Sequence, residues 1–194
     1  MGKMCYNEVM KNIQSILPFF VFFVNIAAFG AAKIEVTTVN LPTYGFSDPD
    51  FVPKPHANYW PYYRYDGFTD KPSNRVWQAV ILENDEIRIT ILPEVGGKIW
   101  GAVEKREGKD FIYYNHVAKF RDISMCGPWT SGGIEFNFGI TGHGPYTSLP
   151  VDWTVRENPE DGSVSYFCGL TEMICRTTWQ VEVVRQIISV SPQK

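Results

Sequence analysis

The residues best suited to chemistry gather in a glycine-rich stretch, residues 126–144. His143 stands between Gly142 and Gly144, so we expect its ring on a loop, where it either hydrogen-bonds a ligand hydroxyl or faces solvent. Glu135 lies among apolar neighbours, and its carboxylate either projects into a cleft as a hydrogen-bond acceptor or faces solvent from a strand. The two side chains would form a general acid and base if they met, which their spacing does not establish.

Aromatic side chains are frequent, with 6 Trp, 10 Tyr and 13 Phe in 194 residues. Trp129 sits in the same glycine-rich stretch, and Trp60 opens a run of aromatic residues that ends at Tyr65. Sugar C–H faces stack on such rings, whereas the alternative for Trp60 is packing of its segment onto the rest of the domain. These patterns make His143, Glu135, Trp129 and Trp60 the candidate ligand-binding residues, and the family resemblance given below implies that the ligand is a carbohydrate.

Several other classes of function are disfavoured. The net charge is -3, the pI is about 5.6 and the chain has no run of Lys and Arg, which argues against a nucleic-acid partner. The sequence has no HExxH, P-loop or GxSxG motif and no Cys and His at zinc-site spacing. We therefore predict no metal ion and no cofactor.

The first part of the chain resembles a targeting segment. Residues 1–32 combine a few basic residues with an uncharged apolar run over 16–32 that ends in small residues. This order is typical of a secretory signal peptide, with cleavage expected after Ala32. The alternative is a membrane anchor, although the run is short and is interrupted by Pro18 and Asn25. We expect a secreted or periplasmic protein with no stable membrane span after cleavage.

Removal of that segment leaves three cysteines, Cys126, Cys168 and Cys175. Cys168 and Cys175 lie close enough in sequence to form a disulfide in an oxidising compartment. The alternative, which we prefer for a domain of this size, is that all three are small apolar residues of a core.

The remaining chain, residues 33–194, reads as short strands separated by turns rather than as helices. A segment rich in Pro, Asp, Gly and aromatic residues over 41–72 is expected to form a long ordered loop or strap. The pattern predicts an all-β fold, an antiparallel β-sandwich in one domain. The main predicted strands are Lys33–Val39, Arg75–Leu82, Glu86–Leu92, Lys98–Glu104, Phe111–Asn115, Trp153–Val155, Ser163–Leu170 and Thr177–Val190.

The last predicted strand is strongly apolar and lies close to residue 194. Such a strand needs a partner on each side or becomes an exposed edge. We expect the chain to be the N-terminal part of a larger β domain, and the alternative is a small complete sandwich whose last strand is central.

Two stretches carry a resemblance to known families. Residues 79–114 (AVILENDEIRITILPEVGGKIWGAVEKREGKDFIYY) resemble the opening strands of the galactose-mutarotase-like β-supersandwich. Gly132-Gly133-Ile134-Glu135, followed by His143-Gly144, is similar in order to a region of hexose-phosphate mutarotase relatives. The region Lys33–Val183 as a whole resembles the domain family DUF5107, which occurs in large secreted bacterial proteins, often ahead of tetratricopeptide repeats.

The resemblance implies a secreted carbohydrate-binding or carbohydrate-processing domain, with a saccharide as ligand and further C-terminal domains as possible partners. If it is an enzyme, the resemblance implies a mutarotase, an epimerase or a glycoside-acting enzyme. The family's acid and base lie on later strands, so the catalytic residues stay unknown and are expected beyond this chain. Ser131 stands where the hexose-phosphate relatives place an Arg, which argues against a sugar phosphate. The alternative is a non-catalytic interaction module that packs on another domain.

Overall fold

A computed structural model describes residues 32–45, 54–55, 63–64, 69–124, 127–138, 145–171 and 176–186. Within these ranges the chain is almost entirely β, with one short 3-10 helix, η2 (Pro145–Ser148), and no α-helix. The prediction of an all-β fold is confirmed. The predicted signal peptide, apart from Ala32, lies outside the described residues. In the described part no helix has the length and apolar character needed to cross a membrane.

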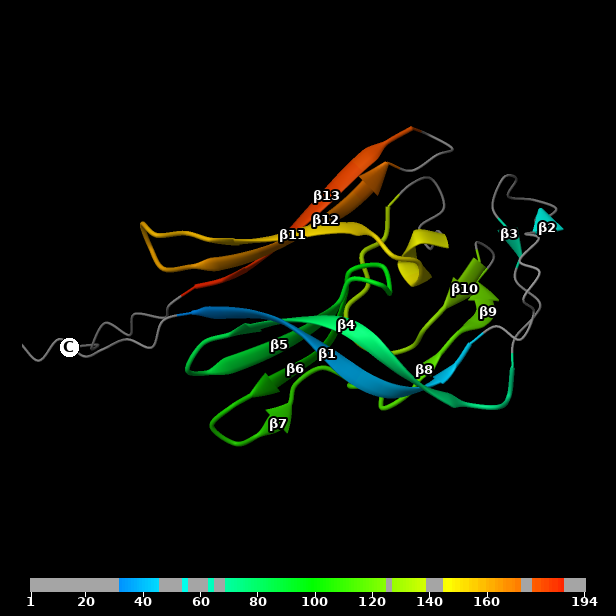
Figure 1. Ribbon diagram of the computed structural model, residues 1–194, viewed down its shortest axis with the longest axis horizontal. Helices are drawn as coiled ribbons and strands as arrows, with labels where there is room; N and C mark the ends of the chain where they lie inside the picture. Colours follow the sequence, from blue (N-terminus) through cyan, green and yellow to red (C-terminus); the bar gives the residue numbers. More distant parts are fainter. Residues whose placement is uncertain are drawn as a thin grey trace, which may run out of the picture.

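The larger layer is a six-stranded sheet in the order β7-β6-β5-β4-β1-β8 (Figure 1). Neighbouring strands pair antiparallel, as predicted, except at one edge, where the two-residue strand β8 pairs parallel to β1. The strands are β1 (Lys33–Tyr44), β4 (Ser73–Glu83), β5 (Ile87–Leu92), β6 (Lys98–Glu104), β7 (Lys109–Asp110) and β8 (Ala118–Lys119).

Local side-chain and glycine chemistry sets the two turns that flank β5. At the first turn the Asn84 side-chain oxygen accepts hydrogen bonds from the backbone N–H groups of Glu86 and Ile87, both at 2.9 Å. At the second turn Gly96 and Gly97 both have φ of +66°, a conformation that glycine adopts without strain. A Cβ on Gly96 would lie 2.7 Å from the carbonyl oxygen of Thr147, so this turn is held directly against η2.

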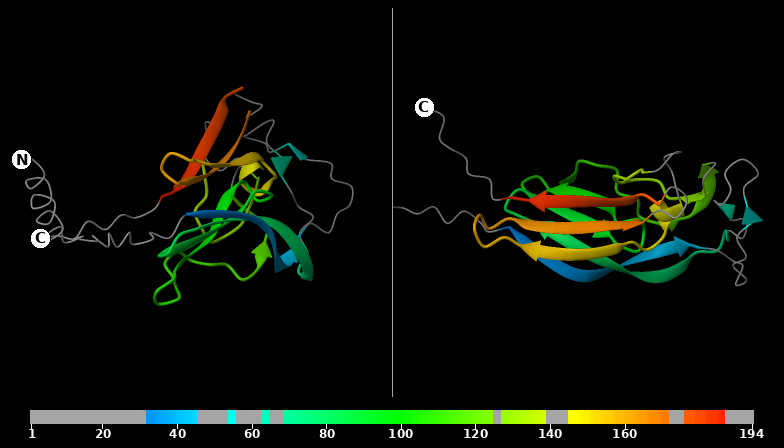
Figure 2. Two further views of the ribbon diagram at one scale, coloured as in Figure 1. Left: turned by 60° about the vertical axis from the view of Figure 1, so that its left-hand side comes forward. Right: turned by 90° about the horizontal axis from the view of Figure 1, so that it is seen from above.

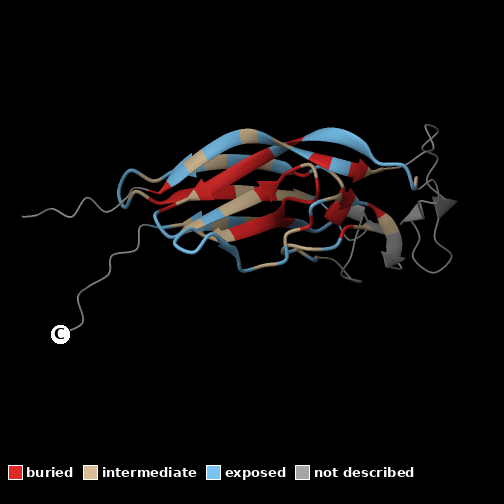
Figure 3. Ribbon diagram, turned by 90° about the horizontal axis from the view of Figure 1, so that it is seen from below, coloured by how far each residue is buried: buried red, intermediate tan, exposed pale blue. Residues whose placement is uncertain are grey.

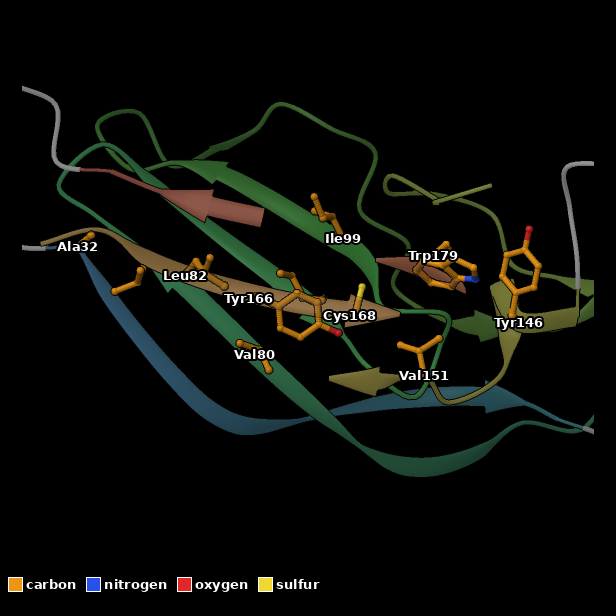
Figure 4. Packing of buried hydrophobic residues seen from close by; sticks show 11 residues of the cluster. Ala32, Val80, Leu82, Ile99, Tyr146, Val151, Tyr166, Cys168 and Trp179 are labelled. Atoms are coloured by element: carbon orange, nitrogen blue, oxygen red, sulfur yellow. The ribbon is translucent and has the colours of Figure 1, made fainter. Parts of the chain in front are cut away.

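The smaller layer is a three-stranded antiparallel sheet in the order β11-β12-β13, which lies across one face of the large sheet (Figure 2). Its strands are β11 (Asp152–Glu157), β12 (Val164–Thr171) and β13 (Thr178–Arg185). The first of two hydrophobic cores lies between the two sheets. In it, Tyr166 and Cys168 of β12 face Val80 and Leu82 of β4 (Figure 4). The predicted β-sandwich is therefore confirmed.

Part of the large sheet is buried on both faces, over residues 79–82 of β4 and 98–102 of β6 (Figure 3). Alternate residues of β4 and β6 enter two different cores, as the pleat of a strand requires. Trp77 and Trp100 lie in the second core, on the face opposite the small sheet, together with Phe120.

The predicted strand Phe111–Asn115 is wrong, because these residues form a bend and an irregular segment after β7. The physical reason is that backbone carbonyl groups of this segment accept hydrogen bonds from other parts of the chain instead of from a neighbouring strand. The Asn115 carbonyl accepts a hydrogen bond from the Trp100 indole N–H at 3.0 Å, and the Tyr113 carbonyl accepts one from the Gly133 N–H at 2.9 Å.

Two small ribbons complete the described elements. One pairs β9 (Arg121–Ser124) with β10 (Gly127–Trp129), and the other pairs β2 (Lys54–Pro55) with β3 (Tyr63–Arg64). The strap predicted over 41–72 begins later than expected, because β1 continues to Tyr44. Most residues of the predicted strap lie outside the described ranges.

The last strand lies at an edge. Among the described residues β13 pairs with β12 alone. Val184 on this strand is 42% exposed, whereas Trp179 near its start is buried.

Cys168 is a buried free cysteine, as the core interpretation expects, and Cys126 and Cys175 lie outside the described residues. Burial raises the pKa of the Cys168 thiol to about 11. We predict that Cys168 reacts with iodoacetamide only after unfolding, because this pKa leaves about a hundredfold less thiolate than an ordinary cysteine has. Peptide mass spectrometry with fragment-level assignment measures the labelling. Equal labelling in native and denatured protein, or a Cys168–Cys175 disulfide, would contradict the prediction.

Candidate functional site

The centre of the candidate site is Lys98, a residue that the sequence analysis did not single out. It is the first residue of β6 and follows the glycine turn. Its neighbour Ile99 enters the first core, and Lys98 lies beneath the opposite face with only 1% of its surface exposed. A lysine is almost never so deeply buried unless its ammonium group has partners.

The Lys98 ammonium has several partners within reach. It donates hydrogen bonds to the Thr130 carbonyl oxygen at 2.6 Å and to the Thr130 Oγ1 at 3.2 Å. Its Nζ lies 3.9 Å from the Glu135 Oε2 in an ion pair. The rings of Trp129 and Trp100 flank it, with their centroids 5.9 Å and 6.0 Å from Nζ, a range in which a cation is attracted to an aromatic ring.

Glu135 reaches Lys98 because the two glycines before it bring two distant segments together. Ile134 and Ile99 exchange backbone hydrogen bonds of 2.9 Å and 3.1 Å in an isolated β-bridge. Gly133 has φ of +66°, and a Cβ on it would collide with the carbonyl oxygen of Ile99. The bridge therefore requires glycine at this position and sets Glu135 next to the start of β6.

The turn that carries Thr130 is fixed by a second set of polar contacts. The Asn115 side-chain amide donates to the Ser131 Oγ at 2.9 Å and to the Ser131 carbonyl at 3.2 Å. Ser131 thus helps to hold this turn. It occupies the position at which the resemblance to hexose-phosphate mutarotase relatives implies an Arg.

Burial dominates the electrostatics of this site. It lowers the pKa of Lys98 from 10.5 to about 8, and the Glu135 carboxylate opposes this shift by favouring the ammonium form. The Glu135 side chain is 10% exposed, and both of its carboxylate oxygens are buried. The site is therefore a deeply buried charged pair, in which the pKa of Lys98 is lowered to about 8.

Two of the four predicted site residues meet in this arrangement. Glu135 is buried rather than solvent-facing, and Trp129 lies half-buried at the end of β10 rather than in a glycine-rich loop. Both contact Lys98, while His143 and Trp60 lie outside the described residues. A lysine that directly follows a predicted Gly-Gly turn has no sequence feature that indicates burial. For this reason the sequence pattern alone did not identify Lys98 as a site residue.

The residues on either side of segment 139–144, which contains His143, are tied together. The Tyr146 hydroxyl accepts a hydrogen bond from the Phe138 N–H at 2.6 Å. Both rings pack on Trp179 of β13, with centroid distances of 4.4 Å for Phe138 and 5.6 Å for Tyr146.

The comparison with family profiles identifies this chain as a member of a known family. Residues 54–187 match the family described as a domain of unknown function, DUF5107, and because this covers more than half of the chain, the chain belongs to that family. The predicted membership is therefore confirmed.

A solved structure shares the fold. It is the crystal structure of a TPR-domain containing protein from Parabacteroides distasonis, with a TM-score of 0.68 and 23% sequence identity. The match covers 80% of this chain and 27% of the other, so this chain spans about a quarter of that protein's length. At this identity the likeness shows the fold alone, and the resemblance to galactose mutarotases stays a prediction.

The close packing of the Ile99–Ile134 bridge predicts that one methyl group added at Gly133 strongly destabilises the fold. Gly133→Ala should lower the free energy of unfolding by at least about 3 kcal/mol, because it combines a strained φ with displacement of the Ile99 carbonyl. Gly108→Ala is the matched control, since Gly108 has a similar φ of +67° but open space around it. Gly108→Ala should lower the free energy of unfolding by only about 1 kcal/mol. Urea unfolding of both variants measures the difference, and equal costs would contradict the role of the bridge.

The buried pair predicts an unusual titration. The Lys98 side-chain methylene signal, followed by NMR with ¹³C-labelled lysine, should show a pKa of about 8, and Glu135→Gln should lower it further by removing the opposing charge. Glu107→Gln is the control, because Glu107 pairs with Lys109 on the surface.

The same pKa has a consequence for stability. Between about pH 8 and 10.5 folded Lys98 has lost the proton that the unfolded chain retains, so the free energy of unfolding of the wild type should rise with pH relative to Lys98→Met. Below pH 8 both states hold the proton and the difference should be constant. A Lys98 pKa that is unchanged in Glu135→Gln would refute the coupling.

Proposed function

We propose that this domain binds a saccharide at the surface formed by Trp129 above the Lys98–Glu135 pair. The observation that carries the proposal is the half-buried Trp129, whose ring lies beside a buried ion pair. An indole face covers the C–H face of a pyranose, and polar groups at its border select the hydroxyl pattern.

Lys98 and Glu135 act in this proposal as positioning residues. Both are too deeply buried for direct ligand contact in this conformation. Their pair fixes the turn at Thr130 and holds the adjacent Trp129 ring, so the aromatic surface is preformed. Preformed surfaces lose less conformational entropy on binding than mobile ones.

His143 remains part of the proposal as a hydrogen-bond donor to the ligand. It lies outside the described residues, and its support comes from the Gly-His-Gly pattern alone. Export of the protein is likewise part of the proposal, and it rests on the signal-like sequence of residues 1–32.

Calorimetry and a glycan array test the proposal on protein recovered from the exported fraction, with its N-terminus read by sequencing. Trp129→Ala should weaken saccharide binding by about tenfold or more, the loss expected for one stacking contact worth over 1 kcal/mol. Glu135→Gln should weaken binding less than Trp129→Ala, because it alters the residues that hold the Trp129 ring in place and leaves the ring that contacts the saccharide.

Val184→Ala is the control for these variants, since it changes an exposed apolar residue on β13. Circular dichroism confirms that each variant is folded. Wild-type affinity in both Trp129→Ala and His143→Ala, or the absence of binding to any saccharide, would reject the proposal.

The second candidate function is an interaction module that packs on another domain. It is favoured by the edge strand β13, which has one neighbour among the described residues and carries the exposed Val184. An unpaired edge presents backbone donors and acceptors that can pair with a further strand. A folded protein that binds no saccharide would favour this candidate over the first.

A further inference from the structure

A separate cavity of about 450 Å³ opens at the end of the large sheet. It lies between the last residues of β1, the first residues of β4 and residues 148–150 at the end of η2 and just after it. Its lining includes the side chains of Ser73, Arg75, Trp77, Glu94 and Phe120. It differs in position and lining from the site around Lys98, because neither Lys98 nor Glu135 nor Trp129 lines it.

Arg75 is fixed in this cavity although its side chain is 51% exposed. Its guanidinium carbon lies 3.8 Å from the centroid of the Trp77 ring, and its Nη2 donates to the Glu94 Oε1 at 3.3 Å. Trp77 is itself immobile, since it is buried and its indole N–H donates to the Thr43 Oγ1 at 3.0 Å.

Glu94 is held as firmly as Arg75. It lies in the turn between β5 and β6, and its Oε2 accepts a hydrogen bond from the Gln78 backbone N–H at 2.7 Å. The carboxylate therefore stands at a set angle beside the guanidinium. Each carboxylate oxygen can still accept another hydrogen bond, and the Arg75 Nε and Nη1 form no hydrogen bond with the described residues.

We propose that this cavity binds a neutral polyhydroxylated ligand, such as a single sugar unit, through the fixed Arg75–Glu94 pair. A donor and an acceptor side by side match two neighbouring hydroxyl groups, one of which accepts from Arg75 while the other donates to Glu94. The aromatic ring of Phe120 and the hydroxyl of Ser73 complete a mixed apolar and polar wall.

The charge balance selects against ionic ligands. An anion attracted by the Arg75 guanidinium would be repelled by the adjacent Glu94 carboxylate, and the reverse holds for an ammonium group, so the neutral pair offers either ion little net attraction. A neutral polyol meets no such repulsion.

Site-resolved NMR tests this proposal independently of the proposed function. The purified protein is titrated with glucose, galactose, mannose and N-acetylglucosamine up to about 10 mM, enough to fill most of a site with a Kd of about 1 mM. Glucuronate and glucosamine serve as charged comparisons. The Trp77 indole N–H and the Gln78 amide report on this cavity, and the Trp129 indole N–H reports on the other site.

We expect a saturable shift of the Trp77 and Gln78 signals with at least one neutral sugar. Arg75→Lys and Glu94→Gln should weaken it about tenfold or more, because each removes a hydrogen bond to a charged group. Arg88→Lys is the matched control: Arg88 pairs with Glu83 at 3.6 Å and is 52% exposed, and neither residue lines the cavity.

Three results would overturn the proposal: no shift of these two signals with any neutral sugar, stronger binding of a charged sugar, or undiminished binding by Arg75→Lys. A shift at Trp129 without one at Trp77 would uphold the proposed function and reject the second site. A shift at Trp77 alone would do the reverse.

Discussion

An ammonium group beneath a β-sheet is tolerated only where hydrogen bonds and an opposite charge replace water, and Lys98 obtains both from residues 130–135. This requirement ties the start of β6 to a segment more than 30 residues further along the chain. The Ile99–Ile134 bridge, the closely packed glycine at 133 and the Asn115–Ser131 contact all serve the same junction. The ring of the half-buried Trp129 lies beside the Lys98 ammonium group.

The turn between β5 and β6 connects the two sites that we propose. Glu94 at its start faces the cavity beside Arg75, and Lys98 immediately after it enters the buried ion pair. Gly96 and Gly97 press the same turn against η2 and against Cys168 of the small sheet. One short turn therefore positions charged groups for both surfaces, and its two glycines make its close packing between the layers possible.

The likeness to a TPR-domain containing protein shows the fold, and membership of the DUF5107 family assigns no function. The proposed ligand binding is supported by side-chain chemistry instead. Both proposed sites combine a Trp ring with a carboxylate and a cation, but they differ in accessibility. At the first the ion pair is buried and supports the ring. At the second the ring is buried and supports the ion pair, which is free to contact a ligand.

The sequence by itself determined the all-β class and the strands and turns on both sides of β5, because strand alternation and turn chemistry are local properties. It selected Glu135 and Trp129 as well, since both stand in the glycine-rich stretch. It failed at Phe111–Asn115, where distant side chains use the backbone that a ladder would need. Only the tertiary structure decided that Lys98 is buried against Glu135 and that Arg75 lies between Trp77 and Glu94. Neither pairing has a local signature, because each depends on how remote strands are brought together.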